Sequence, residues 1–152
     1  MDIRLKNDAV FQVVGPTGCG KTLFVTQLLS NSEQYFINKV KHIYWLMGVV
    51  KGEKGQTSQG LEKLKNLEIL NGFEEGWLSK PRSGDAIVVD DLYAEAVHEK
   101  NFNNLFTKIS RHRGVTVMYI LRKTCFIKVG NIVREISMCN IWYYLKTHVI
   151  VL

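Results

Sequence analysis

The sequence predicts an α/β protein with three layers and a largely parallel central sheet. Two observations lead to this prediction. Short apolar runs rich in β-branched residues alternate with stretches of helical character, and a glycine-rich turn joins the first of those runs to a helix. At 152 residues the chain has the length of one domain, so residues 1–152 are predicted to fold as a single unit.

The first half of the chain shows this alternation clearly. A mostly apolar run predicts a buried strand, and the residues after its glycine turn predict a helix. A second apolar run, a polar glycine-bearing loop and a stretch that can continue as a helix come next. In order, these five elements are Ala9–Val14, Thr22–Ser30, Lys41–Leu46, Lys51–Gly60 and Leu61–Leu67.

The second half adds further strands and one helix. The turn signal Pro81–Asp85 precedes a strand at Ala86–Val89, and Val115–Leu121 predicts another. Trp142–Leu152 contains at least a fifth strand. Between these strands, apolar residues at i, i+3, i+4 and i+7 define one face of an amphipathic helix: Phe102, Leu105, Phe106 and Ile109.

The composition is that of a folded protein inside the cell. Hydrophobic residues make up 46% of the chain and charged residues 22%, which is far from the profile of disorder. No apolar run approaches the ~20 residues of a membrane-spanning helix, and Met1–Lys6 is charged where a signal peptide is apolar. We therefore expect an intracellular protein, cytoplasmic or nuclear, without a membrane partner.

Cysteine usage and net charge give less information about the function of the protein. Cys19, Cys125 and Cys139 are odd in number and scattered, so they predict reduced thiols and neither disulfides nor zinc. The net charge of +6 permits contact with a polyanion, but many intracellular proteins are mildly basic without one. Charge alone does not decide whether nucleic acid is a partner.

The most informative motif is GPTGCGKT, which matches the P-loop pattern G-x-x-x-x-G-K-[ST]. In such a loop, backbone N–H groups at the start of a helix surround phosphate oxygens. Lys21 would contact the β- and γ-phosphates of ATP, and the Thr22 hydroxyl would bind Mg²⁺. The predicted nucleotide-binding residues are Gly15, Pro16, Thr17, Gly18, Cys19, Gly20, Lys21 and Thr22.

Two structural alternatives belong beside this interpretation. A glycine turn between a strand and a helix, with Lys21 merely solvated, would give the same pattern without a ligand. Cys19 lies inside the loop and permits a redox role, whereas a side chain directed away from the phosphates is the simpler account. The agreement of motif and predicted context favours the phosphate-binding loop.

Two aspartates end the strand at Ala86–Val89. In a parallel sheet they would reach the same carboxyl edge as the phosphate-binding loop, where ligands bind in such folds. We assign Asp90 to the Mg²⁺ shell and Asp91 to water positioning or general base catalysis, and the reverse order stays open. Glu95 and Glu99 lie close enough to compete but are more typical of a solvated turn.

Basic residues elsewhere have two interpretations. Ser110–Arg113 closes the amphipathic helix, where cations suit the negative end of the helix dipole, but the same residues could contact DNA or the γ-phosphate. Cations after the fourth strand could include a phosphate sensor or an arginine finger, although each alone is typical of a solvated surface. These cations are Arg122, Lys123, Lys128 and Arg134.

Several blocks together resemble the genome-packaging ATPases of large DNA viruses and Polinton-type elements, within the FtsK–HerA superfamily. The blocks are FQVVGPTGCGKTLFVTQLL, IYW at Ile43–Trp45, AIVVDDLYAEA, LFTKISRHR and REIS at Arg134–Ser137, and they cover nearly the whole chain. The phosphate-binding loop is common to many families. DDL followed by LFTK-x-S-x-HR is far more particular.

The resemblance implies a P-loop ATPase that hydrolyses ATP to move double-stranded DNA into a capsid. It implies a ring, a hexamer, with DNA in its channel, and a virion-associated location if the protein is viral. Arg134 matches a family arginine and is carried over as a candidate finger or sensor in catalysis, with Arg113 as the other candidate.

The chain departs from the family in two places. The family pattern has a Gln-Asn pair after the fourth strand, whereas Arg122 and Lys123 stand here and cannot accept a hydrogen bond from water. The sequence also stops at Leu152 in an apolar run, where the family continues, so the chain is expected to be C-terminally truncated relative to it, as a fragment or a decayed copy.

Three functions follow, in decreasing order of support. The first is a DNA-translocating packaging ATPase that uses ATP and Mg²⁺. The second is a degenerate module that binds ATP without hydrolysing it. The third is a small-molecule kinase in which Ser110–Arg113 clamps the transferred phosphate, and it is disfavoured because no arginine-rich lid segment is evident.

Overall fold

A computed structural model describes most of the first two thirds of the chain and three short strands after it. The described residues are 4–48, 60–92, 102, 105, 109–121, 126–129, 132–135 and 148–151. The helical segments among them are α1 (Lys21–Ser30), α2 (Ser32–Tyr35), η1 (Leu61–Lys63), η2 (Trp77–Ser79) and α5 (Ser110–Arg113).

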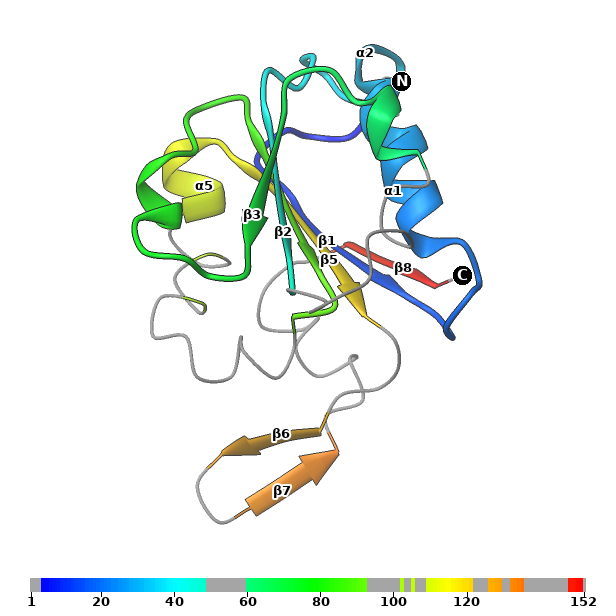
Figure 1. Ribbon diagram of the computed structural model, residues 1–152, viewed down its shortest axis with the longest axis vertical. Helices are drawn as coiled ribbons and strands as arrows, with labels where there is room; N and C mark the ends of the chain where they lie inside the picture. Colours follow the sequence, from blue (N-terminus) through cyan, green and yellow to red (C-terminus); the bar gives the residue numbers. More distant parts are fainter. Residues whose placement is uncertain are drawn as a thin grey trace.

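Six strands form one sheet in which every neighbouring pair is parallel, in the order β3-β2-β4-β5-β1-β8 (Figure 1). This arrangement confirms the predicted α/β class with a parallel sheet. The strands are β1 (Val10–Val14), β2 (Ile43–Met47), β3 (Leu67–Asn71), β4 (Ala86–Asp90), β5 (Thr116–Leu121) and β8 (His148–Val151).

One predicted helix is wrong. The stretch Leu61–Leu67 was expected to continue as a helix, but only Leu61–Lys63 is helical and β3 begins at Leu67. Asn66 adopts a left-handed conformation with φ 57°, which ends the turn and starts the strand. Asn66 also accepts, through its backbone oxygen, the N–H of Ile43 at 2.9 Å, so the edge strand is docked onto β2 from its first residue.

Both faces of the sheet are buried, as expected for parallel strands. On one face, Val25 and Leu29 of α1 pack with Phe11 and Trp45. The opposite face carries a second buried cluster that includes Trp77 and the two described residues Leu105 and Ile109. Figure 1 shows α1 and α5 on opposite sides of the sheet.

The predicted amphipathic helix is described only in part. Leu105 and Ile109 are buried against the sheet, and the Phe102 ring packs on Tyr119 with centroids 5.1 Å apart, so three of the four predicted residues face the core. Phe106 lies outside the described residues. The helix end is α5, which stops at Gly114 in a left-handed conformation with φ 64°, a typical glycine C-cap.

A two-stranded hairpin was not predicted. It consists of β6 (Phe126–Val129) and β7 (Ile132–Glu135), which pair antiparallel with Ile127 opposite Arg134. Figure 1 shows it below the sheet as a separate unit. The described residues contain no helix that is both long and apolar enough to cross a membrane.

Candidate functional site

The candidate site begins where β1 turns into α1. β1 ends at Val14 and α1 begins at Lys21, so the predicted loop lies between a strand and a helix. Gly18 and Gly20 have φ of 81° and 86°, which L side chains rarely adopt, and a Cβ at either position would meet no atom within 4 Å. The loop therefore needs glycine for its conformation and is open on that side.

The start of α1 is prepared for an anion. The first N–H groups of a helix have no acceptor within it, and no side chain caps α1 at Gly20. The first turn contains no acidic residue, so nothing there opposes a negative ligand. A phosphate placed over this turn would meet free N–H donors and the positive end of the helix dipole.

Lys21 is held inside the loop. Its Nζ donates to the backbone oxygens of Gly15 at 2.8 Å and Pro16 at 2.6 Å, and lies 3.8 Å from Cys19 Sγ. Only 8% of the residue is exposed. The ammonium is thus fixed at the centre of the loop, while Cys19 itself is an exposed free thiol.

Asp90 is the point at which separate elements meet. One carboxylate oxygen, Oδ2, accepts hydrogen bonds from Thr22 Oγ1 at 3.4 Å and from Trp45 Nε1 at 3.3 Å. These donors come from α1 and β2, whereas Asp90 ends β4. The two residues predicted to bind Mg²⁺, Thr22 and Asp90, are therefore in direct contact although they are 68 positions apart.

The electrostatics of Asp90 are unusual for an aspartate. Burial raises the pKa of its carboxyl group, and the neighbouring Asp91 raises it further, against the hydrogen bonds from Trp45 and Thr22 and the charge of Lys21, which lower it. Burial is the largest of these effects, so the donors present do not fully compensate the buried negative charge. A cation beside Asp90 would compensate the rest of that charge.

Asp91 follows at a sharp turn. It is exposed and has φ 56°, a conformation that aspartate tolerates better than most residues. Its backbone N–H donates to the Ile120 oxygen at 3.4 Å, which ties the turn to the neighbouring strand β5. The turn places Asp91 at the rim of the same edge, next to the buried Asp90.

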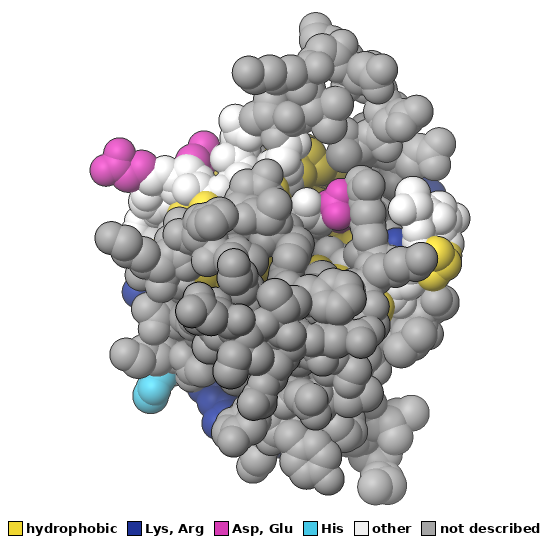
Figure 2. Space-filling model, turned by 90° about the horizontal axis from the view of Figure 1, so that it is seen from below, with side chains coloured by type: hydrophobic (Ala, Val, Ile, Leu, Met, Phe, Trp, Pro, Cys, Tyr) yellow, Lys and Arg dark blue, Asp and Glu magenta, His cyan; other side chains and the backbone are white. Residues whose placement is uncertain are grey.

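The end of β5 lies between the loop and the two aspartates, because β5 separates β1 from β4 in the sheet. Its last residue, Leu121, accepts the Gly15 N–H at 3.4 Å on one side, and Ile120 accepts the Asp91 N–H at 3.4 Å on the other. Figure 2 looks at the molecule from below, toward the edge at which the strands of Figure 1 end.

Other predicted residues are not at this edge. Ser110–Arg113 precedes β5 and therefore lies at the opposite, amino edge of the sheet, where Arg113 Nη1 donates to the Leu78 oxygen at 2.8 Å. Within its own chain Arg113 does not reach the loop, which corrects the expectation that this cluster could contact a γ-phosphate bound there. A contact across a subunit boundary stays a prediction.

The remaining predicted residues are outside what the structure describes. Arg134 lies in β7, but its side chain is not among the described ones. Arg122, Lys123, Glu95 and Glu99 fall outside the described residues, and so do Cys125 and Cys139. Lys128 lies in β6 and its side chain is likewise not described.

Sequence reasoning missed the role of Trp45 at this site. Its strand was predicted, and Trp45 was counted in the block IYW that resembles packaging ATPases, but no contact with Asp90 was predicted for the fully buried indole. A buried indole N–H usually finds a hydrogen-bond partner, and Trp45 stands on β2, the neighbour of the strand that ends in Asp90. That combination is the signal that could have identified it.

A metal at this edge would need ligands beyond the protein. Among the described residues there is no group of three or more His, Cys, Asp or Glu side chains that could hold an ion. Mg²⁺ at nucleotide sites is usually bound by one or two protein oxygens together with phosphates and water, which Thr22 and Asp90 fit.

No protein-family model matches the chain, and neither does any curated protein. The resemblance to packaging ATPases therefore stays a prediction from the sequence.

Proposed function

We propose that this protein is a P-loop ATPase of the DNA-packaging type, which binds ATP with Mg²⁺ and couples its hydrolysis to movement of double-stranded DNA. One observation carries the proposal: the glycine loop with Lys21, the hydroxyl of Thr22 and the buried carboxylate of Asp90 converge at the carboxyl edge of a parallel sheet.

The residues have distinct roles in this proposal. Lys21 exchanges a backbone oxygen of the loop for phosphate oxygens, and the N–H groups at the start of α1 hold the same anion. Thr22 and Asp90 bind Mg²⁺, which would neutralise charge on the β- and γ-phosphates. Asp91, exposed beside them, orients water or accepts its proton.

The DNA partner and a homo-oligomeric ring, a hexamer by resemblance, belong to the same proposal. They are supported by the sequence blocks that resemble packaging ATPases and by the net charge of +6. In a ring, an arginine of the neighbouring subunit completes each site, and Arg134 and Arg113 are the candidates from the sequence.

The second candidate function is an ATP-binding module that does not hydrolyse ATP. A specific observation favours it. β5 ends between the loop and the aspartates, and the next residue in the chain is Arg122, where the family has a polar amide. A guanidinium donates hydrogen bonds but accepts none, so it cannot orient attacking water as an amide does.

Phosphate release, measured with and without double-stranded DNA, separates the two functions. A packaging ATPase releases phosphate faster when DNA is added, and Lys21→Ala abolishes the release. A binding module shows Mg²⁺-dependent nucleotide binding with no release above that of Lys21→Ala. Absence of any Mg²⁺-dependent nucleotide binding would contradict both.

The sensor position is tested by restoring the amide. We expect Arg122→Gln to raise the rate of phosphate release if the site is otherwise complete, because an amide can both donate to the γ-phosphate and accept from water. Lys123→Gln is the matched control, since it removes the same charge one position further on. An equal effect of both changes would argue against Arg122 as the sensor position.

A further inference from the structure

At the amino ends of the strands, opposite the candidate site, the loops that precede the strands are joined to one another by backbone hydrogen bonds. The Lys41 N–H donates to the Gly84 oxygen at 3.0 Å, and the Gly84 N–H donates to the Gly114 oxygen at 3.0 Å. These residues precede β2, β4 and β5, which are adjacent in the sheet. The segments before three neighbouring strands therefore form one continuous stretch of hydrogen-bonded backbone, which is called the ledge.

Four exposed cations stand on this ledge, and together they are called the amino-edge ridge: Lys41, Arg82, Arg111 and Arg113. Adjacent strands lie about 4.8 Å apart, so the ridge extends over roughly 10 Å across the three strands. One or two cations belong to each strand. The ridge is thus a row of positive charges whose spacing is set by the sheet.

Hydrogen bonds hold parts of the ridge in place. Lys41 Nζ donates to the Ser83 oxygen at 3.2 Å, and Arg113 Nη1 donates to the Leu78 oxygen. Ser110 is buried and its Oγ donates to the Asp8 oxygen at 2.7 Å, which anchors α5 and leaves Arg111 and Arg113 on its exposed side. The side chains of Lys41 and Arg113 are therefore positioned before any ligand arrives, and the helix that carries Arg111 is anchored to the protein.

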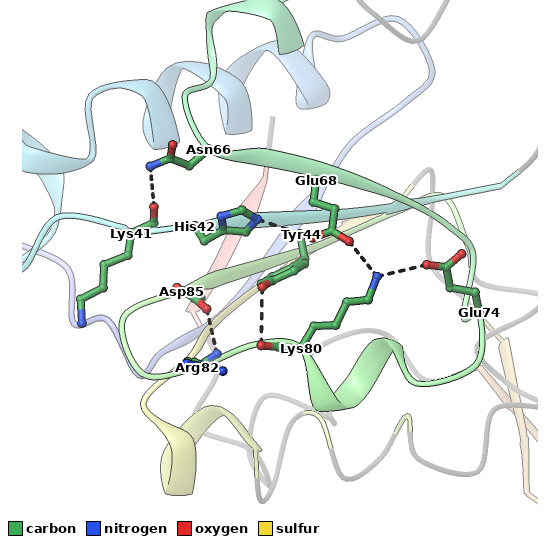
Figure 3. A network of polar contacts seen from close by, with 9 residues as sticks. All are labelled: Lys41, His42, Tyr44, Asn66, Glu68, Glu74, Lys80, Arg82 and Asp85. Carbon is green, nitrogen blue, oxygen red and sulfur yellow. Dashed lines mark hydrogen bonds and ion pairs between the residues drawn. The ribbon is translucent and has the colours of Figure 1, made fainter.

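Of the acidic residues near the ridge, Asp8 is exposed beside α5, whereas Asp85 and Glu68 do little to neutralise the ridge cations. Asp85 is 6% exposed, and its Oδ2 accepts the backbone N–H of Arg82 at 2.8 Å beneath the surface. Glu68 bonds Lys80 at 2.7 Å and faces His42, so its charge is already engaged (Figure 3). Among the described residues, no ion pair joins an acidic group to any ridge cation.

We infer that the amino-edge ridge binds the phosphate backbone of double-stranded DNA. A row of fixed, unneutralised cations is the feature that phosphate backbones recognise, and it carries no sequence information. Apart from the imidazole of His112, which stands between Arg111 and Arg113, the described residues place no exposed aromatic ring among the ridge cations, and this scarcity of stacking surfaces favours a duplex over a single strand. None of the exposed large hydrophobic side chains in the described part of the chain belongs to the ridge, whereas a protein interface usually contains such anchors.

This inference shares the DNA partner with the proposed function but does not use the nucleotide. The ridge and the loop containing Lys21 lie at opposite edges of the sheet. DNA binding measured without ATP therefore tests the ridge alone. Lys21→Ala should bind DNA as the wild type does even though its binding of nucleotide is weakened.

The test measures the affinity for a short DNA duplex over a range of salt concentrations, without nucleotide. Each phosphate contact contributes about 0.9 to the slope of log K against log salt concentration, so four contacts give a slope of about −3.6. The triple variant Lys41→Gln, Arg82→Gln and Arg111→Gln should flatten the slope by about 2.7. Its affinity at 0.1 M salt should fall by roughly eightfold per cation.

A triple variant with the same change in net charge provides the control. Lys39, Lys63 and Lys65 are exposed cations outside the ridge, in the segments before β2 and β3, and the positive charges of Lys39 and Lys65 are partly neutralised by Glu33. Their replacement by Gln should change the slope by less than a third as much. A charge-preserving variant, Lys41→Arg with Arg82→Lys and Arg111→Lys, should keep the wild-type slope, which guards against misfolding as the cause.

Equal loss of affinity in the two Gln triple variants would overturn the inference, because net charge and not the ridge would then explain binding. Tighter binding of single-stranded than of double-stranded DNA would overturn it as well. The expected result is loss in the ridge variant alone, with Lys21→Ala unchanged.

Discussion

Two carboxylates at opposite ends of the sheet have pKa values that are shifted in opposite directions. At the carboxyl edge, burial raises the pKa of Asp90. Near the amino edge, the hydrogen bond from Lys80 lowers the pKa of Glu68, and the charges of Lys80 and His42 lower it too. Glu68 has its partners within the chain (Figure 3), whereas the partners of Asp90 leave part of its charge uncompensated.

Glu68 is a surface carboxylate that is already paired, whereas Asp90 is a buried carboxylate that a ligand cation would stabilise. Glu68 is solvated and paired with Lys80, which in turn lies 3.5 Å from Glu74. Among the described residues, the hydrogen-bond donors to Asp90 are the neutral side chains of Thr22 and Trp45, and the charge of Lys21 acts on Asp90 without a hydrogen bond. Carboxyl groups with a shifted pKa at the carboxyl ends of parallel strands are typical of functional sites.

The largest expected effect is on Lys21. Replacing it with Ala removes the ammonium that would contact the phosphates, and a lost charge-assisted hydrogen bond weakens binding by on the order of 100-fold. Titration calorimetry with ATP and Mg²⁺ measures this loss. Lys80→Ala is the matched control at the other edge and should leave nucleotide affinity within about twofold. Equal losses in the two variants would remove the distinction between the edges.

The next effect concerns Asp90 in the absence of nucleotide. Because the pKa of Asp90 is raised in the folded chain, the protonated form favours folding, and that contribution is lost as the pH rises through the folded pKa. Asp90→Asn should therefore raise the melting temperature at neutral pH, by on the order of 2–4 °C.

The gain from Asp90→Asn should disappear at acid pH, where the wild-type carboxyl group is protonated as well. Mg²⁺-dependent phosphate release should be lost in the same variant, since an amide is a poorer ligand for Mg²⁺ than a carboxylate. Thermal unfolding at both pH values measures the first outcome. A variant less stable than wild type at neutral pH would contradict the account of Asp90.

A smaller effect is expected at Trp45. Trp45→Phe keeps most of the buried volume but removes the N–H that donates to Asp90 Oδ2. We expect the Mg²⁺ concentration that gives half-maximal nucleotide binding to rise about tenfold, because a hydrogen bond to a charged group is lost. Nucleotide affinity without Mg²⁺ should not change.

Trp77→Phe is the control for Trp45. Trp77 is also buried, at 3% exposure, but it packs in the cluster on the other face of the sheet. Its replacement should lower stability without moving the Mg²⁺ dependence. If both variants shift the Mg²⁺ dependence alike, Trp45 contributes packing and no specific contact.

The smallest effect is expected at Glu68. Glu68→Gln removes a solvent-exposed ion pair with Lys80, and such pairs add little to stability. The melting temperature should move by less than about 2 °C, and nucleotide and Mg²⁺ binding should stay at wild-type values. A change in Mg²⁺ dependence would show that the amino edge influences the site, and the two edges would then not be independent.

Much of the carboxyl edge could be predicted from the sequence because its signals are local. The strand before Gly15, the helix that contains Lys21 and the strand that ends in Asp90 each have a clear apolar pattern. That Thr22 and Asp90 would meet follows from the parallel arrangement of those strands. Once the strands and the helix are recognised, the parallel topology is enough to predict that the residues at their adjoining ends lie close together.

The rest depended on contacts that have no local pattern. β3 was not predicted, and only its first residue fell in the expected helix Leu61–Leu67, because Leu67–Asn71 is short and mixes polar with apolar residues, as edge strands do. The bond from Trp45 to Asp90 and the ledge beneath Lys41 and Arg82 required the order of the strands. Register across the sheet, not residue type, decided both.

The carboxyl edge is proposed to bind ATP with Mg²⁺. The most direct test is the melting temperature of the wild-type protein with ATP, with and without Mg²⁺. A ligand that binds the folded state stabilises it by about 2.7 kcal/mol at 100 times its Kd, so we predict an ATP-dependent rise that Mg²⁺ increases and Lys21→Ala removes. A melting temperature that ATP and Mg²⁺ leave unchanged would contradict the account.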